Sequence, residues 1–133
     1  MKKICHILWI LIMAACSLPE SKPLKLEKDV EQLTSELKQL SNFADAKVKW
    51  SIRTVEEKTE SQLTIELFDG VNVPQNEIQL RDLGREASKV VANSISNEDD
   101  YDVFKVVFVQ KFSAGIASAS ITKDFEYTVD ELK

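Results

Sequence analysis

The side chains that most often carry enzyme chemistry are scarce in this chain of 133 residues. The only histidine is His6, and the two cysteines are Cys5 and Cys16. Imidazole and thiolate groups supply most nucleophilic, acid–base and zinc chemistry in proteins. If the first fifteen residues are removed, no histidine remains and Cys16 is the only cysteine. The mature chain can then assemble neither a Ser-His-Asp nor a Cys-His arrangement, and it can form no internal disulfide.

Carboxylates are the remaining candidates for catalysis, because paired acids can hydrolyse glycosides without histidine. They cluster at Glu56, Glu57 and Glu60 and again in residues 97–102, two polar segments that we expect to be solvated. The second segment offers oxygen atoms to Ca²⁺, but it lacks the glycine that the EF-hand template requires at its sixth position. The three glycines are too far apart to form a phosphate-binding loop. We therefore expect a noncatalytic protein with no metal site and no cofactor.

The first fifteen residues have the layout of a secretory signal peptide. Lys2 and Lys3 give a cationic start, residues 4–15 are uncharged and mostly apolar, and Ala14-Ala15 form a small pair before Cys16. A membrane-spanning helix needs about 20 apolar residues, and the uncharged run ends by Pro19. The segment is too short to remain as a spanning anchor.

The order Met13-Ala14-Ala15-Cys16 resembles the lipobox of bacterial lipoproteins, although Met13 stands where leucine is usual. The resemblance covers this segment only. It implies that the thiol of Cys16 is modified with diacylglycerol, that the bond before it is cut, and that acyl chains hold the protein on a membrane. Ser17, where aspartate would favour the inner membrane, implies the outer membrane in a cell that has two. The alternative is an ordinary cleaved signal peptide.

The length and charge of the rest of the chain indicate one globular, acidic domain. The composition, 44% apolar and 29% charged, is that of a globular protein, and the length suits one domain. Loss of the signal removes two lysines and no acid, which changes the formal net charge from −5 to −7 and argues against nucleic-acid binding. We expect a signal peptide in residues 1–15, the lipidated Cys16 and a flexible tether in residues 16–25, and a single domain in residues 26–133.

Two stretches have helical periodicity. The first has apolar residues at 26, 30, 33, 37 and 40, a spacing that suits packing on a sheet or, as the alternative, a short coiled coil with a partner. The second begins after Asn76, a good N-cap, and has an apolar stripe from Leu80 to Ile95. Gly84 within it predicts close approach to another backbone, because glycine costs up to about 1 kcal/mol in a helix interior.

Four stretches have strand patterns, at residues 47–53, 62–67, 101–112 and 116–127. With the helices they give the order αββαββ. This order predicts a two-layer α+β domain, in which a four-stranded, mainly antiparallel sheet carries two helices on one face. A cystatin-like fold with one helix cradled by the sheet is the rival. Trp50 alternates with Val48 and Ile52, which favours a place in the core over a role in stacking on a ligand.

The third strand is apolar on both faces, and this feature bears most on function. If Phe104, Val106 and Phe108 meet the helices, the valines between them point to a face that a two-layer fold leaves uncovered. The predicted contact surface is therefore made of Val103, Val107 and Val109. The competing interpretation is that long neighbours such as Lys49 and Arg53 shield these valines. Those two cations and Lys47 could also bind an anion, although a solvated outer face beside Glu66 explains them equally well.

The sequence thus favours a membrane-tethered, noncatalytic envelope lipoprotein whose domain contacts a protein partner or a second copy, or supports envelope assembly. The alternative is a small-ligand carrier or sensor. Its pocket would lie between the sheet and the helices, opened by the small residues Ala117 and Ala119.

Overall fold

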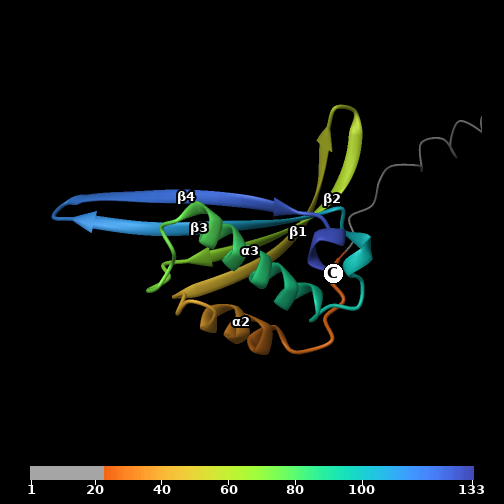
Figure 1. Ribbon diagram of the computed structural model, residues 1–133, viewed down its shortest axis with the longest axis horizontal. Helices are drawn as coiled ribbons and strands as arrows, with labels where there is room; N and C mark the ends of the chain where they lie inside the picture. The colour runs from red at the N-terminus through yellow and green to blue at the C-terminus, as the bar shows by residue number, and fades with distance from the viewer. Residues whose placement is uncertain (1–22) are drawn as a thin grey trace, which may run out of the picture.

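The computed structural model describes residues 23–133, which form a two-layer α+β fold (Figure 1). The order αββαββ is confirmed. The elements are α2 (Val30–Gln39), β1 (Asp45–Val55), β2 (Lys58–Phe68), α3 (Glu77–Ala92), β3 (Val103–Ala114) and β4 (Ala117–Tyr127), with short 3₁₀ turns at Glu98–Asp100 and Asp130–Leu132.

The four strands lie in the sheet in chain order, β1-β2-β3-β4. The two outer pairs, β1 with β2 and β3 with β4, are antiparallel hairpins. The central pair, β2 with β3, is parallel, because α3 returns the chain to the end of the sheet at which β2 began. The sheet is therefore mainly antiparallel, as predicted.

Both helices pack on the same face of this sheet (Figure 1). Alternate residues of each strand point toward them, so that the strand pattern of the sequence becomes one side of the core. Leu33 and Leu37 contribute from α2, and the apolar stripe of α3 contributes from the second helix. The apolar strand residues with no exposed surface at all are Leu63, Ile65, Leu67, Phe104 and Val106. Burial of each such side chain stabilises the fold by about 1.5–3 kcal/mol, before losses of conformational entropy.

The first helix is shorter than the apolar spacing predicted. It begins at Val30, which is 63% exposed, whereas Leu26 forms an isolated β-bridge with Ile95. The backbone of Lys25 is tied to the same segment, since its carbonyl accepts from the amide of Ser96 at 2.8 Å. The part of the expected tether that the structure describes is thus already bound to the domain.

The second helix is capped as predicted, with the side chain of Asn76 accepting hydrogen bonds from the amides of Ile78 and Gln79. Gly84 does lie in a close contact, but the partner is a side chain rather than a backbone. A Cβ atom at this position would stand 2.5 Å from the hydroxyl oxygen of Tyr127. That hydroxyl donates a hydrogen bond to the carbonyl of Arg81, and burial raises the pKa of Tyr127. The close contact between α3 and the end of the last strand therefore favours glycine at this position.

We predict that Gly84→Ala destabilises the protein by about 1–3 kcal/mol, because the added methyl group must displace the ring of Tyr127. The gain in helix propensity, up to about 1 kcal/mol, is too small to offset this overpacking. Urea denaturation followed by far-UV circular dichroism measures the difference. The matched control is the same substitution in a Tyr127→Phe background, where the cost should be smaller because the nearest atom is gone. A Gly84→Ala variant as stable as the parent would contradict this packing.

Candidate functional site

The face of the sheet opposite the helices is the candidate contact surface. In residues 23–133 no helix packs on this face (Figure 1). Phe104 and Val106 are fully buried in the core, so the alternating residues Val103, Val107 and Val109 point to the open face, as the sequence predicted. Their exposure differs, however. Val103 is only 9% exposed, whereas Val107 and Val109 are half-buried.

Val103 lies at the end of the sheet where an arginine reaches across the open face. Arg53 of β1 donates to Glu126 of β4 at 2.6 Å and to Glu60 of β2 at 2.9 Å. These two hydrogen bonds raise the pKa of the Arg53 guanidinium. The first and last strands are thus joined over this end of the open face. With 9% of its surface exposed, Val103 is a poor contact residue.

Val107 sits between two carboxylates on the neighbouring strands, opposite Glu66 of β2 and Asp124 of β4. Each carboxylate has a cation of its own protein. Lys49 pairs with Glu66, and Lys105 pairs with Asp124 at 3.4 Å. Such exposed pairs contribute about 0–1 kcal/mol each to stability. Their main effect here is to place a charged rim on both sides of an apolar side chain.

Val109 has an apolar neighbour that sequence reasoning missed. It lies opposite Phe68, the last residue of β2, and the ammonium nitrogen of Lys47 stands 5.4 Å from the centre of the Phe68 ring. The missed signal was the adjacent pair Leu67-Phe68, because consecutive residues of a strand point to opposite faces. We call the half-buried residues Phe68, Val107 and Val109 the open-face strip.

The cations of β1 do not form a separate anion site. Lys49 and Arg53 pair with carboxylates of the same sheet, and Lys47 lies over an aromatic ring. This arrangement fits the solvated outer face beside Glu66 that the sequence offered as the simpler explanation.

Trp50 was expected in the core, and that prediction is wrong. The side chain is 43% exposed on the helix side of β1, although Leu63 opposite it is fully buried. The physical reason is that β1 is an edge strand with eleven residues, whereas α2 has only ten. At about 1.5 Å per helical residue and about 3.3 Å per strand residue, the helix is less than half as long as the strand.

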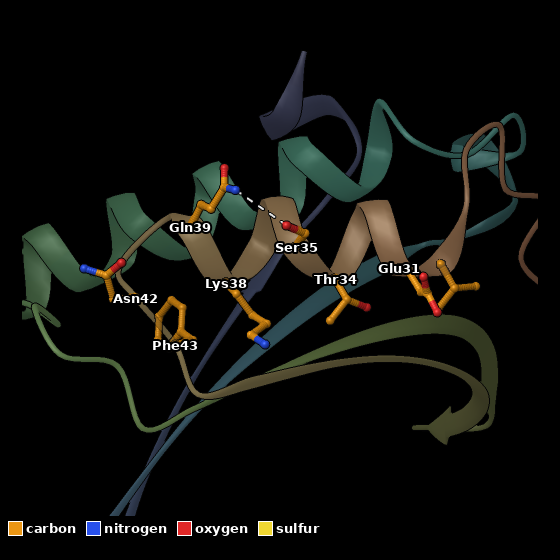
Figure 2. Close-up of a pocket in the computed structure, with 8 residues that line it drawn as sticks. Glu31, Thr34, Ser35, Lys38, Gln39, Asn42 and Phe43 are labelled. Carbon is orange, nitrogen blue, oxygen red and sulfur yellow. Dashed lines mark hydrogen bonds between the residues drawn. The ribbon is translucent and has the colours of Figure 1, made fainter.

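Three shallow recesses on the surface bear on the ligand-carrier alternative. One of about 500 Å³ lies beside α2 and Phe43. Figure 2 shows Thr34 and Lys38 on one side of this helix, and on another side Ser35, whose hydroxyl accepts a hydrogen bond from the side-chain amide of Gln39. A second, of about 420 Å³, lies between the loop that precedes α3 and the β3–β4 hairpin, and its apolar lining includes Val71, Leu80, Phe112 and Ile121. The third, of about 450 Å³, lies along the hairpin itself and includes Ala119.

The two alanines expected to open a pocket between the layers do not do so. Ala117 and Ala119 lie on the projecting part of β4 and are exposed. The described side chains instead fill the space between sheet and helices with a continuous core.

The acidic segments have structural roles. Asp102 accepts a hydrogen bond from the amide of Ser61 at 2.9 Å and so joins the start of β3 to β2. Glu56 and Glu57 form the tight turn of the first hairpin, both with positive φ. Within the described part of the chain, no cluster of three or more Asp, Glu, Cys or His residues is placed to hold a metal ion.

Cys16, the predicted lipidation site, lies outside the described residues. In residues 23–133 no helix has the length and apolar character needed to cross a membrane. Comparison with protein-family models, curated proteins and solved structures found no match for the chain.

Proposed function

We propose that this protein is a noncatalytic lipoprotein of the cell envelope that presents its α+β domain to a protein partner. The observation that carries the proposal is the one-sided core. Two helices cover one face of the sheet, and the other face keeps the open-face strip between paired charges. An apolar centre with a polar rim is the usual anatomy of a protein interface. Its small size suits a transient contact rather than a permanent one.

Lipid at Cys16 would fix the location of this domain. Residues 16–22, at no more than about 3.5 Å each, would allow it to stand up to about 25 Å from the lipid surface. The chain is attached to the domain from Pro23 onward, since the Pro23 carbonyl accepts a hydrogen bond from the side chain of Asn97. Confinement to a membrane raises the effective concentration of two partners, so a weak contact can suffice. The outer membrane is the proposed site in a cell with two membranes.

The absence of catalysis is proposed from the residue inventory and from how the acids are used. Removal of the signal would leave no histidine, and Cys16 would be acylated. Four carboxylates of the open face pair with cations, namely those of Glu60, Glu66, Asp124 and Glu126. No cofactor is required by this function.

A ligand-binding role is the second candidate, and the recess of about 420 Å³ favours it. Its volume lies in the range of small-molecule sites, and its lining is mostly apolar with Gln75, Gln110 and Lys123 as polar groups. This recess is on the helix side of the hairpin, so changes to the open-face strip should leave ligand binding there intact.

The lipid anchor is tested by the mass of the native product. We expect a chain that begins at Cys16, carries acyl groups and sediments with membranes, because the lipobox-like segment directs both acylation and cleavage. Cys16→Ser should abolish acylation and leave the signal peptide attached. An uncut product without lipid would contradict the proposed location.

The contact surface is tested by Val107→Lys, which places a charge in the middle of the open-face strip. We expect loss of a partner that co-purifies with the wild-type protein from its own membranes, or a fall in the mass of the complex in solution. The matched control is Val30→Lys on α2, which adds the same charge at an exposed valine on the other layer. If Val107→Lys leaves the mass and the recovered proteins unchanged, the open face is not the contact surface.

A further inference from the structure

The second candidate interaction surface is the outer edge of β4. Among the described residues β4 pairs only with β3, so its other edge has no neighbouring strand. Alternate residues of an edge strand direct their amide and carbonyl groups away from the sheet, where they can pair with another strand. We call residues 117–122 the β4 edge segment.

This segment lacks the features by which edge strands usually avoid such pairing. Charged residues, proline, β-bulges and covering elements normally protect an edge. The β4 edge segment consists of Ala, Ser, Ile and Thr only, and its register with β3 runs without a bulge. By contrast, the other edge strand, β1, carries the cationic residues Lys47, Lys49 and Arg53 along its length. The protein therefore protects one edge of its sheet and leaves part of the other accessible.

The β4 edge segment is also exposed to solvent and not covered by either helix. It belongs to the part of the β3–β4 hairpin that projects beyond both helices, at the opposite end of the domain from the C-terminus (Figure 1). Every residue from Ala117 to Asp124 is exposed. Phe112 and Ile121, on the helix side of the same hairpin, are 50% and 56% exposed.

We propose that the β4 edge segment pairs with the same segment of a second copy, antiparallel and centred on Ser120. The pairing is isologous, with a two-fold axis perpendicular to the sheet, and joins two four-stranded sheets into one of eight strands. It goes beyond the contact proposed for the open-face strip, because it uses the strand edge and not the face.

The side chains of this register are self-complementary on the open face. Directly opposed residues of two antiparallel strands lie on the same face. Ser120 then opposes Ser120 of the second copy, and Ser118 opposes Thr122. All are hydroxyl side chains, which donate and accept hydrogen bonds to one another across strands.

The helix side of the same register is complementary in size. Ala119 opposes Ile121 of the second copy, and within each copy Phe112 lies on the other side of Ala119. The small alanine leaves room for the exposed ring of Phe112 and the exposed Ile121 side chain to approach above it. The two-fold axis creates this contact twice in the dimer, and each contact would remove one Phe112 ring and one Ile121 side chain from water.

Charge disfavours registers shifted toward the C-terminal end of β4. Only Lys123 among the charged residues of β4 enters the paired region, opposite Ala117 of the second copy. Registers centred on Lys123 or on Asp124 would oppose like charges directly and are disfavoured. The β4 edge segment is therefore complementary to itself, and a second copy of this chain is the partner that it fits.

The test is disulfide trapping of the full chain in its native membranes under mild oxidation. Opposed Cα atoms of an antiparallel pair lie about 4.5–5.5 Å apart, within the range of a disulfide. Ser120→Cys should therefore shift to twice the monomer mass on a non-reducing gel. Ser118→Cys and Thr122→Cys should each remain monomeric when expressed alone, because the four-residue offset separates like positions by about 13 Å. The two variants expressed together should cross-link to each other.

The parent chain, whose only cysteines before processing are Cys5 and Cys16, is the control for cross-links through the native cysteines. The gel reads pairing at position 120 whether or not Cys16 carries lipid, so failure of the lipoprotein proposal is seen separately in the product mass. No dimer band above the parent for Ser120→Cys, or equal bands for all three single variants, would overturn the proposal.

A second measurement does not need a new cysteine. Ser120→Lys places two positive charges directly opposite each other, and we expect the sedimentation coefficient of the detergent-solubilised protein to shift from dimer to monomer. Ser51→Lys, an exposed serine on the β1 edge strand, is the matched control and should leave the dimer intact. A wild-type monomer at all concentrations, or a dimer that survives Ser120→Lys, would contradict pairing at this edge.

Discussion

The two helices cover only one face of the four-stranded sheet, and the other features of the molecule follow from this. All fully buried strand residues, such as Leu63, Ile65 and Val106, point to the helix side. The remaining side of the sheet must be stabilised by its own side chains or by a partner. It is stabilised in part by ion pairs, and Arg53 joins the first strand to the last at one end. Between the pairs the open-face strip stays accessible.

Unequal lengths of helix and strand explain where the other apolar groups are exposed. The sixteen residues of α3 span about 24 Å, whereas strands of eleven or twelve residues span about 36–40 Å. The four-stranded sheet therefore extends past the helices at both ends. Trp50 lies on one uncovered part, and Phe112 and Ile121 lie on the other. The Gly84–Tyr127 contact brings α3 close to the C-terminal end of β4, away from the projecting part of the hairpin.

Much of the fold was predictable because it rests on local periodicity. The alternation of β3 and the N-cap at Asn76 predicted the direction of side chains and the start of a helix correctly. Contacts between distant segments were not predictable. The burial of Val103 accompanies an ion pair between residues 53 and 126, and the need for Gly84 comes from a ring 43 positions away. Trp50 was misjudged because its exposure depends on how far α2 extends along β1. Phe68 was missed although the adjacent pair Leu67-Phe68 carried the signal.

The decisive question is whether the open-face strip is covered in the cell, and the labelling rate of Val107→Cys with a maleimide answers it. The one-sided core predicts rapid labelling of the purified protein and slow labelling in native membranes, where a partner covers the strip. Val30→Cys on the outer layer should label equally in both settings, and the parent chain corrects for the native cysteines. Equal rates for Val107→Cys before and after purification would show that no partner covers this face.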